Sequence, residues 1–290
     1  MKEGAQMAEA VELFEVGPRD GLQNEQREIP VSEKVALVDM LSNAGFRRIE
    51  MASFVSPKWV PQMAGSADVL AGIKRAEGVR YAALTPNMRG YTDALAAGAD
   101  EIAVFGAASE GFSKANINAS IDESIQRFRP ILDAARHIDL PVRGYISCVT
   151  DCPYDGPVDP GAVAKVADAL FAMGCYEISL GDTLGQATPD SIVRMLLAVR
   201  DVVPATRLAG HYHDTSGRAL DNIDASLSLG VRVFDSAVGG LGGCPYAPGA
   251  AGNVATEAVA AHLARLGYET GLDADVLSTA ADMARAMRTG

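Results

Sequence analysis

Eight short runs that favour β-strands recur along this chain, and each is followed by a run with the apolar spacing of a helix. Strands that alternate with helices form parallel βαβ units, and eight units in about 250 residues are the number that closes a TIM barrel. We therefore predict an α/β fold, a (β/α)8 TIM barrel with an extra C-terminal helix, in a single domain over residues 1–290. The expected strands are 11–17, 46–54, 80–87, 101–109, 141–149, 176–183, 206–214 and 231–238.

The expected helices occupy the intervals between these strands and the end of the chain. Pro30 and Gly45 bound the first of them, because proline favours a helix start and glycine a helix stop. The helices are 30–45, about 63–76, one ending at Gly98, 121–138, one ending at Gly174, one beginning at Pro189, one ending at Gly230, 253–267 and 273–287. A doubly wound sheet is the competing fold, but the residues after the first strand, PRDGLQNE, lack its glycine-rich fingerprint.

The charge balance of the chain excludes some kinds of partner. With 37 acidic and 25 basic residues the net charge is −12, which argues against nucleic acid and anionic membranes, since both bind basic surfaces. The N-terminal residues lack the apolar run of a signal peptide, and no stretch reaches the ~18 apolar residues of a membrane span. The four cysteines form no CxxC pair and are expected as free thiols in a reducing compartment, so we predict a cytoplasmic protein.

Polar residues cluster where the expected strands end. Because the carboxyl ends of the strands form the catalytic face of a TIM barrel, side chains at these positions are candidates for chemistry. They lie on the first, second, sixth and seventh strands and on the loop after the eighth: Arg19, Asp20, Glu50, Asp182, His211, His213, Cys244 and Asn253.

The two histidines form the most informative pair. Side chains repeat with a period of two along a strand, so His211 and His213 point to the same face. Two imidazoles with a carboxylate and an amide oxygen nearby suit an octahedral divalent ion of the Mg²⁺ or Mn²⁺ type, and Asp20 lies on the same rim. The alternative is that one histidine is a ligand or base and the other is a core residue satisfied by hydrogen bonds.

The carboxylates and the arginine also have structural interpretations. Arg19 and Asp20 either both reach a ligand, where the chain turns at the end of the strand, or form a salt bridge on the rim. Glu50 interrupts an apolar run and is either exposed or, if buried, paired with a cation such as Arg19. Asp182 either belongs to the site or caps the following helix.

Cys244 lies in GGLGGCPYAPGAAGN (239–253), where six of fifteen residues are glycine. A free cysteine is most often a small buried apolar residue, but core segments rarely contain so many glycines. We therefore interpret the segment as a mobile loop that carries a reactive thiol.

Seven segments together closely resemble the 3-hydroxy-3-methylglutaryl-CoA lyases of the DRE-TIM metallolyase superfamily. The resemblance covers about residues 11–270. HYHDT and the Arg–Asp pair suit the superfamily at large, whereas the cysteine loop and FVSPKWVPQM indicate the lyases. The segments are VGPRDGLQNE (16–25), FVSPKWVPQM (54–63), LTPN (84–87), FGAASE (105–110), GCYEISLGDT (174–183), HYHDT (211–215) and GGLGGCPYAPGAAGN (239–253).

The resemblance implies cleavage of 3-hydroxy-3-methylglutaryl-CoA to acetyl-CoA and acetoacetate with Mg²⁺ or Mn²⁺ as cofactor. It implies a homodimer, a role in leucine degradation or ketone-body formation, and CoA contacts from Lys114 and Asn116, unless Lys114 is simply a solvated lysine. It implies the metal ligands Asp20, His211, His213 and Asn253, and the catalytic residues Arg19, Asp20, Glu50, Asp182, His211 and Cys244.

Physical chemistry assigns roles within this retro-Claisen reaction. A divalent ion acidifies the tertiary hydroxyl, Asp20 or a nearby water takes the proton, and Arg19 stabilises the enolate. Cys244 then protonates the enolate, since an ordinary thiol is mostly protonated at neutral pH. Two alternatives stay open: another DRE-TIM lyase, aldolase or condensing enzyme acting on a related acyl-CoA or 2-oxo acid, and a non-catalytic barrel that binds a metal or acyl-CoA.

Overall fold

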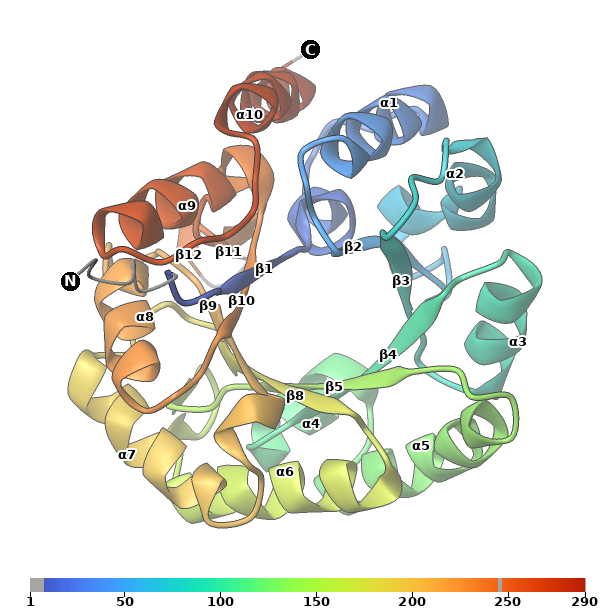
Figure 1. Cartoon of the computed structure of the whole chain (residues 1–290). Coiled ribbons are helices and arrows are strands. Elements are labelled where there is room, and N and C mark those ends of the chain that lie inside the picture. Colours follow the sequence, from blue (N-terminus) through green and yellow to red (C-terminus); the bar gives the residue numbers. More distant parts are fainter. Residues whose placement is uncertain (1–7, 245–246, 290) are drawn as a thin grey trace, which may run out of the picture.

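Eight parallel strands close into a barrel in the order β1-β10-β9-β8-β5-β4-β3-β2, with helices around the outside (Figure 1). This computed structural model describes residues 8–244 and 247–289, and their side chains except for 243–251 and 289. The (β/α)8 barrel predicted from the sequence is confirmed. Its strands are β1 (Glu12–Glu15), β2 (Arg48–Ser53), β3 (Arg80–Leu84), β4 (Glu101–Ala107), β5 (Val142–Ser147), β8 (Glu177–Asp182), β9 (Leu208–Tyr212) and β10 (Val233–Ser236).

The outer helices follow the expected intervals, and most end a few residues earlier than expected, whereas the last helix, expected over 273–287, extends to Thr289. An additional helix, α10 (Ala274–Thr289), packs against the first helix, α1, and so lies between the last and first helices of the ring (Figure 1). None of the helices in the described part of the chain combines the length and apolar character needed to cross a bilayer. The ring consists of α1 (Val31–Ser42), α2 (Ser66–Gly72), α3 (Met88–Ala96), α5 (Ile121–Arg136), α6 (Pro160–Met173), α7 (Pro189–Arg200), α8 (Ala219–Ser228) and α9 (Thr256–Arg265).

Local signals explain several of these boundaries. Ser120 and Glu123 form a reciprocal capping box at the start of α5, and Thr188 accepts a hydrogen bond at the start of α7. Gly174 ends α6 with a φ of +111°, a conformation that residues with a Cβ rarely adopt.

Several short elements were not predicted from the sequence, because they have too few residues for a periodic signal. Helix α4 (Glu110–Ile117) follows β4, and a π-helical turn, η1 (Gly17–Gly21), follows β1. A 3₁₀ turn at Pro61–Met63 precedes α2 and overlaps the helix expected over about 63–76 only at Met63. The chain also forms two hairpins, β6 (Asp151–Cys152) with β7 (Gly156–Pro157) and β11 (Gly243–Cys244) with β12 (Ala247–Ala251).

Strand β5 shows how side chains divide between the two sides of the barrel wall. Val142 and Ile146 belong to the main apolar core between the strands and the helices. Arg143 and Tyr145 alternate with them and point inward, where Arg143 reaches Asp235 on the opposite part of the barrel. The interior of this barrel is therefore partly ionic, rather than filled only by the apolar layers that are usual in the fold.

Glu15 ties three elements together at the end of β1. It is fully buried, and its carboxylate accepts hydrogen bonds from the backbone N–H of Gly17 (2.7 Å) and Val238 (2.9 Å) and from Thr256 Oγ1 (2.7 Å). Val238 begins the 3₁₀ turn η4 (Val238–Gly240) and Thr256 begins α9, so the segment between these elements is held at both ends. Burial raises the pKa of Glu15 to about 7, although the hydrogen bonds oppose this shift.

Replacing Glu15 with glutamine is expected to change how stability depends on pH. A carboxyl group whose pKa rises from 4.5 to about 7 on folding stabilises the fold below pH 4.5, and this contribution is lost as the pH rises to 7. Glu15→Gln is neutral throughout and keeps an amide oxygen for the two backbone donors. Urea unfolding from about pH 5 to 8 should show the parent losing up to ~3 kcal/mol relative to the variant. Parallel pH profiles would contradict the raised pKa.

Candidate active site

A cavity of about 750 Å³ opens at the carboxyl ends of the barrel strands. It brings together residues from the end of β1, from β9 and from the segment before α9, which are far apart in the sequence. Six residues proposed from the sequence line it: Arg19, Asp20, Asn116, His211, His213 and Asn253. This is the face at which TIM barrels carry their chemistry.

Asp20, His211 and His213 form a cluster in which the potential ligand atoms all lie within 4.8 Å of one another. Asp20 is held in η1, immediately after β1, and His211 lies in β9. His213 follows β9 and forms an isolated backbone bridge with Asn253. The side-chain nitrogen of Asn253 donates to Asp20 Oδ2 (2.8 Å), so Asn253 faces the cluster through its amide nitrogen and not through the oxygen expected of a ligand. Asn253 also precedes α9, which begins at Thr256 and not at Asn253 as expected.

The electrostatics of the cluster suit a divalent cation. Burial and the neighbouring His211 lower the pKa of His213 to about 4 against the opposing charge of Asp20, so its imidazole is neutral near pH 7. His213 Nδ1 is buried and has no hydrogen-bond partner among the described residues. Burial opposes ionisation of Asp20, but Arg19 and both histidines outweigh it and hold its pKa at about 2. An anionic carboxylate beside an unpaired neutral nitrogen is a donor set that Mg²⁺ or Mn²⁺ fits.

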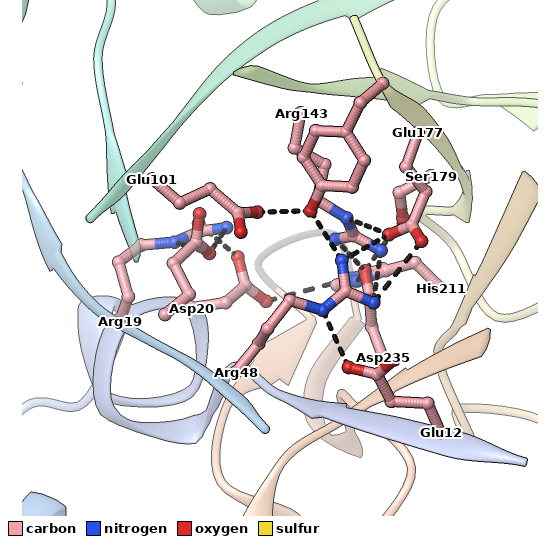
Figure 2. A network of polar contacts seen from close by, with 12 residues as sticks. Glu12, Arg19, Asp20, Arg48, Glu101, Arg143, Glu177, Ser179, His211 and Asp235 are labelled. Atoms are coloured by element: carbon pink, nitrogen blue, oxygen red, sulfur yellow. Dashed lines mark hydrogen bonds and ion pairs between the residues drawn. The ribbon is translucent and has the colours of Figure 1, made fainter. Parts of the chain in front are cut away.

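Arg19 lies against this cluster and is paired with two carboxylates (Figure 2). Its Nε donates to Glu50 Oε2 (2.6 Å) and its Nη1 donates to Asp20 Oδ1 (2.6 Å). Glu50 is fully buried and does not line the cavity. It therefore follows the second of its two expected interpretations, a buried carboxylate that is paired with Arg19. The pKa of Arg19 is raised, because the charges of Glu50 and Asp20 outweigh the effect of burial, so the guanidinium stays charged.

The structure does not bring Asp182 together with these residues. Asp182 is buried at the end of β8, where its carboxylate accepts the backbone N–H groups of Ala187 (3.0 Å) and Gln186 (3.3 Å). This resembles the capping interpretation, although the residue that caps α7 is Thr188. Burial raises the pKa of Asp182 to about 6 despite these hydrogen bonds. Asp182 is absent from the cavity lining, so its proposed catalytic role has no contact to support it.

Of the two residues expected to contact CoA, only one lies at the cavity. Both Lys114 and Asn116 lie on α4 and are exposed, but only Asn116 lines the cavity.

The glycines before Cys244 have a defined structural role. Gly239, Gly240 and Gly242 adopt φ values of +67°, +63° and +99°. A Cβ on Gly239 would lie 2.9 Å from the carbonyl oxygen of Ala281, and one on Gly242 would lie 3.0 Å from Asn253 Nδ2. All three positions therefore need glycine for their left-handed turns, and Gly239 and Gly242 also need it for close packing. The mobility inferred for the cysteine loop stays a prediction.

Cys244 itself lies in β11, where its backbone pairs with Ala247. Its side chain falls outside the described residues, so the thiol role remains a prediction.

Two residues of the site were missed by sequence reasoning. Tyr145 lines the cavity, and its buried hydroxyl has no hydrogen-bond partner among the described residues. The guanidinium groups of Arg19 and Arg143 lie 5.6 Å and 4.8 Å from the centre of its ring. Asp235 contacts His211 from below the cavity, with Oδ2 at 3.1 Å from Nδ1. Asp235 interrupts an apolar strand just as Glu50 does, and that signal was available in VRVFDSAV.

The fold and the site together define a TIM-barrel enzyme with a candidate divalent-cation site at the carboxyl ends of its strands. A family model described as HMGL-like matches residues 10–284 of the chain. The chain therefore belongs to the HMGL-like family.

Individual relatives agree with this assignment. The chain is 60% identical to the 3-hydroxy-3-isohexenylglutaryl-CoA/hydroxy-methylglutaryl-CoA lyase of Pseudomonas aeruginosa, over 92% of this chain and 89% of that protein. The crystal structure of an HMG-CoA lyase from Brucella melitensis is 60% identical, with a TM-score of 0.97 and coverage of 98% and 100%. An HMG-CoA lyase from Acinetobacter baumannii, solved in complex with coenzyme A and 3-methylmalate, is 34% identical, with a TM-score of 0.91 and coverage of 96% and 91%.

Proposed function

We propose that this protein is a hydroxymethylglutaryl-CoA lyase, a carbon–carbon lyase that cleaves 3-hydroxy-3-methylglutaryl-CoA to acetyl-CoA and acetoacetate. The observation that carries the proposal is the convergence of Arg19, Asp20, His211 and His213 on one cavity in a chain of this family. The names of relatives that are 60% identical over nearly the whole chain support the same reaction.

Asp20, His211 and His213 would hold the cofactor, Mg²⁺ or Mn²⁺, and Asn253 would join them if its amide presented the oxygen. When bound, such an ion lowers the pKa of a coordinated hydroxyl. Asp20 is anionic near pH 7, and its carboxylate is the proposed acceptor of the hydroxyl proton, directly or through a water.

Arg19 would bind the thioester oxygen as the carbon–carbon bond breaks. Negative charge develops on that oxygen in the enolate of acetyl-CoA, and a fixed guanidinium in a partly closed cavity stabilises it. Arg19 does not act as an acid, because its charge is held by Glu50 and Asp20. Protonation of the enolate carbon is the role proposed for the Cys244 thiol.

Replacing His213 with alanine is expected to raise the Mn²⁺ concentration needed for half-maximal activity by at least about 100-fold, because the cluster loses one ligand. Activity and calorimetric titrations with Mn²⁺ measure this directly. His262→Ala is a matched control, since His262 lies on α9 and pairs with Asp224 (2.7 Å) away from the cavity. Unchanged metal dependence in His213→Ala would remove this residue from the ligand set.

One assay tests the function itself. The full chain is incubated with 3-hydroxy-3-methylglutaryl-CoA and Mg²⁺ or Mn²⁺, and acetoacetate is measured. We expect acetoacetate to form with either ion, and we expect its formation to stop when a chelator is added. Absence of acetoacetate, with product from acetyl-CoA and a 2-oxo acid, would favour a condensing enzyme, and absence of both would favour a binding protein.

We also propose that the cavity accepts a longer substituent at carbon 3. The Pseudomonas aeruginosa relative is named for an isohexenyl substrate as well, and the cavity lining includes several large apolar side chains. These side chains are Leu84, Phe105, Phe112, Ile117 and Phe128. The same assay with 3-hydroxy-3-isohexenylglutaryl-CoA should give 3-oxo acid product, and complete inactivity with that substrate would restrict the enzyme to the methyl compound.

Further proposals rest on the sequence resemblance. They are CoA contacts from Lys114 and Asn116, a homodimer, a cytoplasmic location and a role in leucine degradation. The coenzyme A complex of the Acinetobacter baumannii relative supports a CoA site in this fold. Size-exclusion chromatography with light scattering tests the dimer.

A further inference from the structure

Asp235 belongs to the polar network inside the barrel that Figure 2 shows, and it contacts His211, which lines the cavity. The side chain of Asp235 is fully buried, and β9 and β10 pair so that Asp235 and His211 stand side by side in register. Side chains that are adjacent in register on neighbouring strands share a face of the barrel wall. Asp235 Oδ2 lies 3.1 Å from His211 Nδ1 as a result.

Three further donors fix the orientation of the Asp235 carboxylate. Arg143 donates to both oxygens, through Nη2 to Oδ1 (2.7 Å) and Nη1 to Oδ2 (3.0 Å), and Ser179 Oγ donates to Oδ2 (2.7 Å). Arg143 is fixed in turn, because its Nε donates to Glu177 Oε1 (2.7 Å) and its guanidinium lies 4.4 Å from the centre of the Phe14 ring. A carboxylate held by a bidentate arginine has little freedom to rotate.

This arrangement selects one form of the His211 ring. An ionised carboxylate only accepts hydrogen bonds, so the neutral imidazole must carry its hydrogen on Nδ1 to satisfy Asp235. Nε2 then keeps its lone pair. Nε2 is the nitrogen that faces the cluster, 3.9 Å from Asp20 Oδ2. In the other neutral form of the ring, the hydrogen lies on Nε2. That hydrogen would point at Asp20 and occupy the position where a cation must bind, and the contact with Asp235 disfavours this form.

We propose that Asp235 is the positioning residue that fixes His211 with Nε2 free to bind the catalytic cation. The inference rests on the proposed function for the existence of that cation site. Hydrogen bonds from metal-binding histidines to carboxylates set the ring orientation, and their loss typically costs about 10- to 100-fold in metal affinity.

Two double variants separate this role from general support of the barrel. Both remove Arg143 together with one of its carboxylate partners, so the net charge of the interior is unchanged. Asp235→Val/Arg143→Met removes the carboxylate that faces His211, whereas Arg143→Met/Glu177→Gln keeps it with Ser179 as a remaining donor. Thermal unfolding of metal-free protein checks that the two variants lose comparable stability.

Mn²⁺ affinity, measured by calorimetry and by the electron paramagnetic resonance of free Mn²⁺, is the first readout. The Asp235→Val/Arg143→Met chain is expected to bind Mn²⁺ about 10- to 100-fold more weakly than the parent, and the Glu177 variant within a few-fold of it. Equal losses in the two variants would overturn the proposal, because they would show a structural role only. Failure of the parent to bind Mn²⁺ would instead overturn the cation site itself, and the proposed function with it.

The second readout needs no metal and is made on the parent protein, with one variant used only to assign its signals. The chain has four histidines, so the ¹⁵N spectrum of metal-free, histidine-labelled parent protein is simple, and the His211 signals are assigned by their loss in His211→Asn. Above the pH at which the ring becomes neutral, His211 is expected with its hydrogen on Nδ1. A hydrogen on Nε2 in the parent would refute the role of Asp235 whatever the metal titrations show.

Discussion

Replacing Arg19 with glutamine is expected to lower kcat for 3-hydroxy-3-methylglutaryl-CoA by about 10³-fold. The variant would lack the positive charge that stabilises the enolate as it forms. Removing a single group of this kind typically lowers kcat by about 10²- to 10³-fold. Arg19 is charged and held by Glu50 and Asp20, so its stabilising effect is already in place before the substrate arrives. Because the charge matters most in the transition state, KM should change far less than kcat.

Arg19→Gln also leaves Glu50 without its cation, and Glu50 is fully buried. An unpaired buried carboxylate is costly, so the free energy of unfolding should fall by about 3 kcal/mol or more. The double variant Arg19→Gln/Glu50→Gln separates the two effects, since it removes both charges of the pair. We expect it to recover much of the stability and none of the turnover. Recovery of turnover with stability would show that Arg19 acts only by holding the fold.

Cys244→Ser is the second prediction with a large expected effect. A serine hydroxyl is a much weaker acid than a thiol, so protonation of the enolate should slow, and turnover should fall by about 10²- to 10⁴-fold. Substrate binding, measured by calorimetry under conditions without turnover, should be retained, because the substituted atom acts after the substrate is bound. The enolate should also return to substrate more often, which single-turnover kinetics would show as a slow product phase.

Cys175→Ala is the control for the loss of a thiol, since Cys175 is buried against the helices at the start of β8 and does not line the cavity. It should keep near-parental turnover. Near-parental turnover in Cys244→Ser would show that another group supplies the proton. Tyr145 would then be the first candidate, because its hydroxyl lies in the cavity without a hydrogen-bond partner among the described residues.

The position of each candidate residue on its strand could be predicted because strand ends are local features. Asp20, His211 and His213 follow or end apolar runs, and closure of the barrel brings all such ends to one face. Short elements such as η1 and α4 could not be predicted in the same way. Their five and eight residues give no clear period, and the turns are stabilised by what surrounds them.

The direction in which each carboxylate points could not be predicted from strand position alone. Asp182 and Asp20 both follow an apolar strand, yet Asp182 turns to backbone N–H groups while Asp20 faces the cavity. A carboxylate turns to the donors that the rest of the chain supplies, and these come from distant segments. The apolar strand around Asp235 was a signal that could have marked it as a candidate, but its orientation depends on Arg143, which lies 92 residues away in the sequence.

The sequence by itself therefore determined the barrel and the face that carries the chemistry, and it placed Asp20, His211 and His213, the candidate cation ligands, on that face. These follow from local strand and helix signals together with the one rule that parallel barrels align their carboxyl ends. Only the tertiary structure decided that Glu50 holds Arg19, that Asp235 faces His211, and that Gly239 and Gly242 form close-packed left-handed turns. Those outcomes depend on contacts between segments that are distant in the sequence. Whether a charge is buried, or a glycine has no room for a Cβ, is decided by the neighbouring atoms that those segments supply.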